Sequence, residues 1–469
     1  MYGGDEVNAI VIDVGTHAVK AGYAGEESPK VYYPSCVGAL TRDKTETRDT
    51  NGKSGQNGAQ AGGRDVEMAE AGADASTTPK KEGEASKAGN KSDRDLFVGH
   101  FALNYRRDGM EVLSPFEQKT GLLNDWEIVE NIWNYTLKDR LQIDPKEHPV
   151  LLAEPNFNTN ECREKSLEIL FETFQPPAVF LSKNACLSSY SAGRPTSLVI
   201  DMGHQSSVAA AVHDGYLLQK SVSRSRIGGD LLTECMHRSV QSKDIKVRPR
   251  YAFERTESKQ NKGTFDVKEL DDYKGSTTET YHKWSVEQIL SDLKETVCRV
   301  SESVFNEEEH ANIPTVTYEL PDGTEVQIGS DRFKVPEVLF NPGLVQTFQD
   351  AQTIENMGVL PLQSMTSLVM ESITKVDVDV RKELYNGIIL AGGSSMLPNV
   401  RERLEREILE QAPGQARVKV IASQNVMERK FGVWIGGSIL ASLGSFQQCW
   451  MSKQEYEEKG ASLIHLKAP

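Results

Sequence analysis

Two segments far apart in the sequence contain residues that could hold a phosphate group. In the first, Asp13, Gly15 and Thr16 follow an apolar run, and Lys20 comes four residues later. Backbone N–H groups of such a turn can surround phosphate oxygens, while the hydroxyl donates a hydrogen bond and the ammonium supplies positive charge. The carboxylate can hold Mg²⁺ through water. Taken alone the pattern is weak, since Asp-x-Gly-Thr also occurs in ordinary hairpins.

The second segment repeats this arrangement. Another apolar run ends in Asp201, and Gly203 follows two residues later. Two such turns predict two similar halves that face each other across a cleft, with Asp13 and Asp201 as metal ligands that hold Mg²⁺ through water. Each segment alone could be an ordinary turn, but two unrelated turns do not explain why the same pattern occurs twice.

A third segment could bind the remainder of a nucleotide. Gly392 and Gly393 follow an apolar run and precede Ser394 and Met396. Paired glycines leave the backbone bare, so a flat ring can approach it closely. The alternative for this segment alone is a helix cap. Together with the two aspartate-bearing turns, it predicts a nucleotide site.

Buried strands are expected to position these segments. Continuous apolar runs at 9–13, 150–153, 198–201 and 387–390 are bounded by turn residues, which is typical of strands buried on both faces of an α/β sheet. Alternating strands and helices predict the α/β fold class.

Apolar spacing predicts helices between these strands. One begins with a capping box at Asn124, and two others cover 285–300 and 401–409. The uncharged stretch 431–451 is long enough to span a bilayer. Its glycines, serines and glutamines favour a buried helix followed by a loop.

Composition narrows the class of protein. The chain has 469 residues, with 53 Lys and Arg against 68 Asp and Glu, and a net charge of −15. This excess of acidic residues argues against a protein whose whole surface binds nucleic acid. Residues 41–95 contain no aromatic side chain and predict a disordered insertion in a surface loop. The basic run 243–250 favours a solvated loop, with a nuclear signal or a DNA contact as the alternatives.

These elements resemble the signature shared by actins, sugar kinases and heat-shock ATPases, and further segments select the actin family. Segments similar to actin lie at 147–154, 163–165, 171–174, 434–443 and 452–456. The likeness covers nearly the whole chain outside the 41–95 insertion. Within the family, the two chain ends and the long insertions resemble the nuclear actin-related proteins that are subunits of chromatin complexes.

The resemblance implies an actin-like ATPase fold, with two pseudo-duplicated α/β domains in four subdomains around a nucleotide cleft. The first domain would comprise 1–191 plus 432–469, which form subdomains 1 and 2, and the second 192–431, which form subdomains 3 and 4. The implied cofactors are ATP and Mg²⁺. The residues whose motifs match those that bind them in actins are Asp13, Gly15, Thr16, Lys20, Asp201, Gly203, Lys294, Glu295, Gly392, Gly393, Ser394, Met396 and Lys430.

ATP hydrolysis is expected to be weak or absent. In actins a Gln and a His align the attacking water, and hydrolysis depends mostly on such positioning. Asn184, one methylene shorter, holds the Gln position, and Val208, which cannot hydrogen-bond, holds the His position. In the second turn, His204 replaces an acidic residue and Gln205 replaces a glycine. Both changes are expected to disturb the metal and phosphate contacts. For His204, a solvated or hydrogen-bonded histidine is favoured over a metal ligand.

The resemblance also implies a scaffold subunit in the nucleus, in chromatin-remodelling and histone acetyltransferase complexes. Its partners would be nuclear actin and a long helix, of the helicase-SANT-associated type, in the large subunit. The changes at 41–95 and 340–370 would prevent homopolymerisation. The partner helix would dock in a groove whose matching residues are Tyr190, Leu440, Leu443, Ser445 and Cys449.

Other partners and functions stay open from the sequence. Histones or linker DNA are further candidate partners, and no membrane contact is expected. The alternative function is a cytoskeletal actin-related ATPase. A sugar kinase would need a catalytic carboxylate beside a sugar pocket, and a chaperone would need a peptide-binding domain; neither feature can be assigned.

Overall fold

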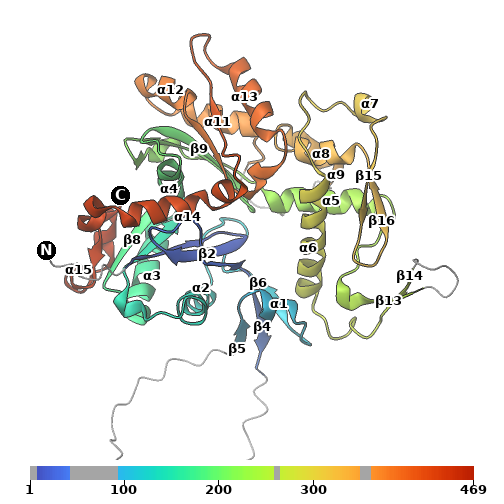
Figure 1. Cartoon of the computed structure of the whole chain (residues 1–469), viewed down its shortest axis with the longest axis horizontal. Helices are drawn as coiled ribbons and strands as arrows, with labels where there is room; N and C mark the ends of the chain where they lie inside the picture. The colour runs from blue at the N-terminus through green and yellow to red at the C-terminus, as the bar shows by residue number, and fades with distance from the viewer. Residues whose placement is uncertain (1–7, 43–92, 258–264, 349–360) are drawn as a thin grey trace, which may run out of the picture. The chain divides into compact units, whose positions relative to one another are not determined.

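The computed structural model describes residues 8–42, 93–257, 265–348 and 361–469, and the chain divides into two units (Figure 1). The large unit comprises residues 1–39 and 96–469, and the small unit comprises residues 40–95. Within the small unit, Arg42 and Asp95 form an ion pair. Most of the predicted disordered insertion, at 43–92, lies outside the described residues, as does 349–360 within the 340–370 stretch.

The large unit contains two mixed sheets of the same design. The strands of the first sheet are β1 (Ile10–Val14), β2 (Ala18–Tyr23), β3 (Val31–Pro34), β7 (Val150–Glu154), β8 (Ala178–Lys183) and β19 (Met451–Ser452). Their order is β19-β8-β7-β1-β2-β3. β1 runs antiparallel to β2 and parallel to β7, and β7 runs parallel to β8.

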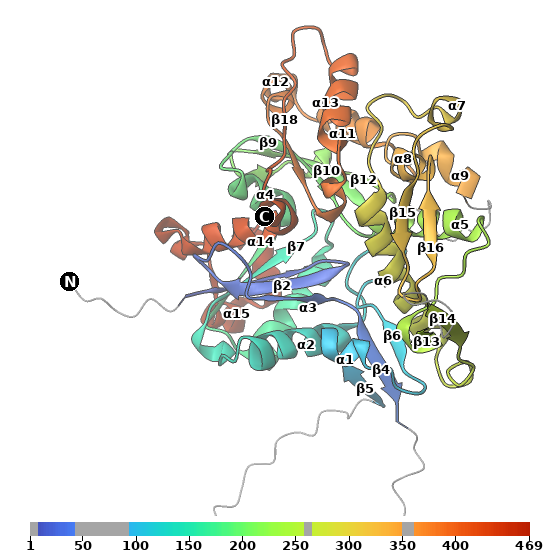
Figure 2. The ribbon, with the colours of Figure 1, turned by 45° about the vertical axis from the view of Figure 1, so that its right-hand side comes forward.

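The second sheet has the same hairpin followed by the same parallel strands (Figure 2). Its strands are β9 (Ser197–Met202), β10 (Ser207–His213), β11 (Tyr216–Leu217), β12 (Ser223–Ser225), β17 (Ile388–Ala391) and β18 (Val420–Ile421). β9 runs antiparallel to β10 and parallel to β17, and β17 runs parallel to β18.

The two hairpins place the two aspartates equivalently. Asp13 on β1 lies opposite Lys20 on β2, and Asp201 on β9 lies opposite Val208 on β10. Both β1 and β9 also pair with a parallel strand on their other side. The four strands predicted from apolar runs are confirmed, each within one residue of its expected bounds. The α/β fold class is therefore confirmed.

The described chain also contains helices and three smaller sheets, of which one has three strands and two have two strands. The helices are α1 (His100–Asn104), α2 (Trp126–Asn134), α3 (Asn160–Ile169), α4 (Asn184–Ser191), α5 (Gly229–Gln241), α6 (Glu279–Val297), α7 (Glu307–His310), α8 (Asp331–Glu337), α9 (Val345–Phe348), α11 (Met365–Thr374), α12 (Val378–Tyr385), α13 (Val400–Gln411), α14 (Val426–Ser442), α15 (Lys453–Lys459) and α16 (Ile464–Lys467). The further strands are β4 (Val37–Thr41), β5 (Arg94–Phe97), β6 (Glu111–Leu113), β13 (Phe253–Glu257), β14 (Phe265–Glu269), β15 (Val316–Glu319) and β16 (Glu325–Ile328).

Capping side chains set the helix starts differently from the sequence prediction. Asp125, not Asn124, caps α2, because its carboxylate accepts a hydrogen bond from the backbone N–H of Ile128 at 3.2 Å. α6 begins six residues before the expected position 285, because the Thr278 hydroxyl accepts from the N–H of Tyr281 at 3.3 Å. A side-chain acceptor at this position satisfies a backbone donor that the helix itself leaves unpaired.

Helix α14 passes close to both α4 and β1. A Cβ atom on Gly436 would lie 1.8 Å from the carbonyl oxygen of Leu187 in α4. The indole N–H of the buried Trp434 donates to the carbonyl oxygen of Val11 at 3.1 Å. The stretch 431–451 is thus a buried helix followed by a loop, as predicted. No helix among the described residues is long and apolar enough to cross a membrane.

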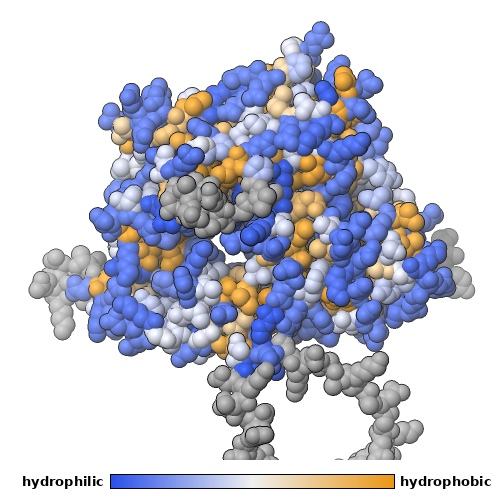
Figure 3. All heavy atoms as spheres, turned by 180° about the vertical axis from the view of Figure 1, so that it is seen from behind, coloured by the Kyte–Doolittle hydropathy of each residue, from blue (hydrophilic) through white to orange (hydrophobic). Residues whose placement is uncertain are grey.

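Helix α4 joins the cores of the two sheets. Each sheet has its own large apolar core, and a small third core brings Ala185 and Cys186 of α4 against Val199 and Val212 of the second sheet. On the face shown in Figure 3, hydrophilic residues predominate and hydrophobic residues form separate patches. The predicted domain limit at 431/432 falls within the continuous helix α14, and the two domain ranges stay a prediction.

Candidate functional site

The two hairpin turns close with the same hydrogen bond. The N–H of Gly15 donates to the carbonyl oxygen of Ala18 at 3.1 Å, and the N–H of Gly203 donates to that of Ser206 at 3.1 Å. A Cβ atom on Gly203 would lie 2.9 Å from the Ser206 oxygen. A side chain there would force the turn open, which explains why the sequence has glycine at this position.

The carboxylates at the base of the turns carry more negative charge than nearby lysine neutralises. The Lys20 ammonium lies 2.8 Å from the Asp13 carboxylate, and both side chains are largely buried. Burial raises the pKa of Asp201 to about 6, the negative charge of Asp13 adds to that effect, and Lys20 opposes it. Burial works against the charged form of Lys20, but Asp13 raises the pKa of Lys20 overall. Two carboxylates that share one ammonium favour an additional cation between them.

A cleft of about 1270 Å³ lies beside the turns in the large unit. Thr16 and His17 of the first turn line it, together with His204 and Gln205 of the second turn. Among the nucleotide-binding residues predicted from the sequence, Thr16 is the one that lines this cleft in the described structure. Sequence reasoning missed His17, although its place inside the first turn, next to Thr16, was the available signal.

The Gly-Gly loop lies against the second turn. Gly392 has a φ of +88°, and a Cβ atom on it would lie 2.5 Å from a carboxylate oxygen of Asp201. The hydroxyl of Ser394 donates to the carbonyl oxygen of Gly203 at 3.0 Å. Gly393 and Met396 belong to the short 3₁₀ turn that follows. The structure therefore brings the second and third predicted segments together.

The predicted lysines point to different places. The Lys430 ammonium lies 4.8 Å from the ring centre of Tyr32, which lines the cleft. Lys294 instead points between α5 and α6, where its ammonium donates to the carbonyl oxygen of Gly229 at 2.9 Å and to Thr233 Oγ1 at 2.8 Å. Burial lowers the pKa of Lys294.

Glu295, next to Lys294 in α6, is exposed and accepts a hydrogen bond from the Ser291 hydroxyl at 3.1 Å. In this structure, Lys294 holds two helices together and neither residue is among those that line the cleft.

Gln205 in the second turn and Arg224 in β12 bind segments that precede the second sheet in the chain. The amide of Gln205 donates to the carbonyl oxygen of Gln118 at 2.7 Å. The Arg224 guanidinium lies 3.6 Å from the ring centre of Phe157 and also donates to the carbonyl oxygen of Thr120. Gln205, expected to disturb the phosphate contacts, thus has its amide nitrogen bound to the opposite segment.

A second set of hydrogen bonds crosses the rim of the cleft. Val112 and Thr280 both line the cleft, and the Val112 N–H donates to Thr280 Oγ1 at 3.1 Å. The N–H of Gly109 donates to the carbonyl oxygen of Ser276 at 2.8 Å. Arg106 Nη1 donates to the Ser276 hydroxyl at 2.9 Å. We call these contacts between 106–112 and 276–280 the rim bridge.

The two positions expected to align water differ in polarity. Asn184 begins α4 directly after β8, and its Oδ1 is buried without a hydrogen-bond partner among the described residues. Val208 is buried opposite Asp201 and offers no polar atom. Asn184 therefore keeps one unpaired acceptor, whereas Val208 provides no polar group opposite Asp201.

The predicted partner groove is partly exposed. Tyr190 is half-buried, Leu443 is 40% exposed, and Ser445 and Cys449 are exposed. Leu440 is only 5% exposed and packs in the core of the first sheet, and its role as a partner contact stays a prediction.

The basic run 243–250 is largely neutralised by acidic neighbours. Lys243 pairs with Asp331, Lys246 pairs with Glu269, and Arg248 lies 2.9 Å from Asp322. This pairing favours the solvated loop over a DNA contact.

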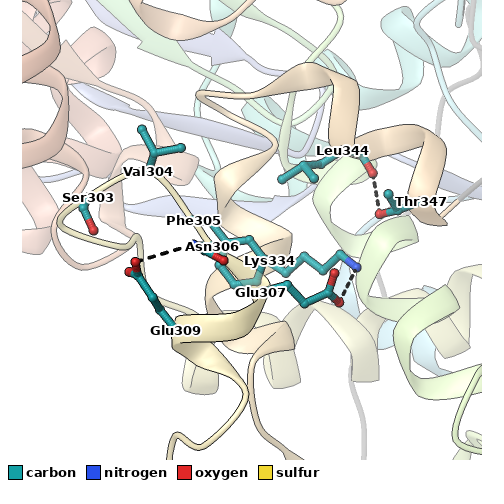
Figure 4. Close-up of a pocket in the computed structure, with 9 residues that line it drawn as sticks. All are labelled: Ser303, Val304, Phe305, Asn306, Glu307, Glu309, Lys334, Leu344 and Thr347. Carbon is teal, nitrogen blue, oxygen red and sulfur yellow. Dashed lines mark hydrogen bonds and ion pairs between the residues drawn. The ribbon is translucent and has the colours of Figure 1, made fainter.

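A smaller hollow of about 650 Å³ lies among α7, α8 and α9 (Figure 4). Its polar side chains pair with one another, as in the 3.4 Å contact of Lys334 with Glu307 and the hydrogen bond from Asn306 to Glu309. None of the nucleotide-binding residues predicted from the sequence is among the described residues that line this hollow.

Comparisons with known proteins agree over the length of the chain. A family model described as Actin matches residues 4–469. The chain is 49% identical, over 100% of both chains, to proteins named Actin-related protein 4 from Oryza sativa subsp. indica and Arabidopsis thaliana. It is 33% identical to a protein of the same name from Yarrowia lipolytica, over 99% of this chain and 96% of the relative.

Proposed function

The chain belongs to the actin family, and on this premise we propose that it binds ATP with Mg²⁺ as a structural ligand and acts as a non-polymerising scaffold subunit of nuclear chromatin complexes. The observation that carries the nucleotide part is the pair of hairpin turns with identical closing bonds and equivalent aspartates. Glycine turns at the carboxyl ends of central strands are where α/β sheets bind phosphate-containing ligands.

The residues present fit a magnesium nucleotide in two respects. Asp13 and Asp201 are incompletely neutralised by Lys20, and the buried Oδ1 of Asn184 lacks a partner among the described residues. Oxygen ligands of this kind suit Mg²⁺, which retains most of its water. When bound, the ion would neutralise phosphate charge; the chain would contribute the second-shell carboxylates and the turn N–H groups.

Weak hydrolysis follows from Val208. An attacking water needs polar groups that hold it in line, and the position opposite Asp201 offers a buried aliphatic side chain. The bound nucleotide would then stabilise the native state, since a ligand specific to that state raises its stability. A single-turnover assay should detect retained ATP. Hydrolysis at the rate of a conventional actin would contradict the proposal.

Titration calorimetry tests nucleotide binding directly. Wild-type protein should bind ATP with Mg²⁺, and Asp13→Asn should weaken binding at least tenfold because it removes one of the two carboxylates. Asp139→Asn changes an exposed carboxylate and serves as the matched control. Equal binding by Asp13→Asn and the control would refute the assignment of the site.

The chromatin role is supported by the family resemblance and by the exposed part of the groove. Affinity purification from nuclear extract should recover actin together with a large remodeller or acetyltransferase subunit. Leu443→Asp should lose that subunit, whereas Leu409→Asp, on a different exposed surface of α13, should retain it. Equal recovery with both variants would contradict docking at the groove.

The alternative, a cytoskeletal actin-related ATPase, makes a different prediction. Such a protein would sediment as filaments under polymerising salt and turn over ATP as it assembles. The proposed subunit should stay in the supernatant under the same conditions.

A further inference from the structure

Two histidine rings meet where the hairpin turns face each other. His17 follows Thr16 in the first turn, and His204 follows Gly203 in the second. Their ring centres are 5.0 Å apart with planes tilted by 51°, and both residues line the cleft. Each turn therefore presents one imidazole at the place where its backbone N–H groups could meet a phosphate.

The lysines nearest the turns are already engaged. Lys20 is paired with Asp13 at 2.8 Å, and Lys294 donates to Gly229 and Thr233. Lys430, whose charge also reaches His17, has its ammonium over the Tyr32 ring, so further positive charge for a phosphate has to come from other groups of the site. Imidazole can supply it, because a histidine that gains a proton has two N–H donors and a full charge.

In the ligand-free structure, the surroundings keep both rings neutral. His17 is exposed to the cleft, and partial loss of water contact there lowers its pKa to about 3; His204, Lys430, Lys20 and Lys294 act in the same direction.

Burial also lowers the pKa of His204; Lys294 and Arg226 add to this, while Asp230 and Glu295 oppose it. A phosphate group placed between the turns would reverse the balance, because its negative charge favours the imidazolium form.

We propose that His17 and His204 together bind the terminal phosphate of a nucleoside polyphosphate and take up protons as it binds. This inference rests on the proposed nucleotide binding and adds to it two ligands that actin-like motifs do not include. Affinity then depends on pH. For each proton taken up, it rises about tenfold per unit fall in pH, as long as the pH lies between the pKa of the free and the bound form.

The experiment is titration calorimetry of ATP and of ADP, each with Mg²⁺, at pH 6 and pH 8. Repeating it in buffers of different ionisation enthalpy counts the protons taken up. The proteins are wild type, the double variant His17→Gln/His204→Gln, and the control His237→Gln, which changes another histidine of the same cleft. Comparison with the double variant removes the contribution of the phosphate's own titration.

Wild type and the control should bind ATP about tenfold or more tightly at pH 6 than at pH 8, with proton uptake beyond that of the double variant. ADP should show a smaller pH effect. Equal pH dependence in wild type and double variant would overturn the inference while leaving the proposed function intact. Tighter ATP binding by the double variant would overturn it too, since the rings would then obstruct the phosphate. Absence of nucleotide binding at either pH would instead refute the proposed function.

Discussion

Replacing Arg403 by Met should destabilise the protein by about 3–5 kcal/mol, because it leaves a buried carboxylate without its partner. Arg403 and Glu337 are each 1% exposed, and their charged groups form two hydrogen bonds of 3.0 and 3.2 Å. Arg403 also donates to the carbonyl oxygens of Ser301 and Ser303 and to the carboxylate of Glu407. Met keeps much of the apolar stem, so the loss measures the charge and its hydrogen bonds.

The same helix provides a matched control. Arg406 lies 3.9 Å from Glu410 and is 43% exposed, so Arg406→Met should change stability by about 0.5 kcal/mol or less. Urea unfolding followed by tryptophan fluorescence compares the two variants.

A third variant separates the charge from the packing. Adding Glu337→Leu to Arg403→Met removes both buried charges and should recover much of the lost stability. A loss of stability in Arg403→Met no larger than that in Arg406→Met would refute the role of the buried charge. A double variant less stable than Arg403→Met alone would refute it as well.

Two further predictions concern helix packing and pH. Gly436→Ala should lower the melting temperature sharply, because the new Cβ would lie 1.8 Å from the Leu187 oxygen. The control Gly432→Ala, whose new Cβ would have its nearest atom at 3.9 Å, should be neutral or slightly stabilising. Equal melting temperatures of the two variants would contradict the packing of α14. Asp201→Asn should stabilise the ligand-free protein by about 3 kcal/mol at pH 7, since a shift of one pKa unit corresponds to about 1.4 kcal/mol and the pKa of Asp201 rises from 3.8 to about 6. The sign follows because the folded state holds its proton more tightly than the unfolded state: the gain should be absent below pH 3.8, grow as the pH rises to about 6, and be complete above it. A gain that is independent of pH in unfolding experiments would refute this.

The sequence predicts the strands and the repeated turns because these depend on local pattern. The run 198–200 is apolar throughout, which is typical of a strand buried on both faces, and Asp201, which follows it, marks the edge of the sheet. The equivalence of Asp13 and Asp201 is visible in the sequence for the same reason, and the structure shows it in the pairing of the strands.

Other features depend on contacts between distant segments. Lys294 matches a nucleotide-binding lysine by motif, but the space between α5 and α6 determines where its ammonium points. Leu440 follows an apolar helical spacing that does not distinguish a groove from a core. The meeting of His17 and His204 requires both hairpins in place, and no local pattern encodes that distance.

The rim bridge has a kinetic consequence. Hinge opening of the cleft along this rim separates 106–112 from 276–280, and therefore breaks the hydrogen bonds made by the amides of Gly109 and Val112. Opening of the cleft is thus a local unfolding event, and the hydrogen bonds of the rim bridge contribute to its free-energy barrier. Hydrogen exchange at these two amides would report how often the cleft opens. A molecule that leaves through this rim cannot dissociate faster than the rim opens, so the opening rate sets its shortest residence time.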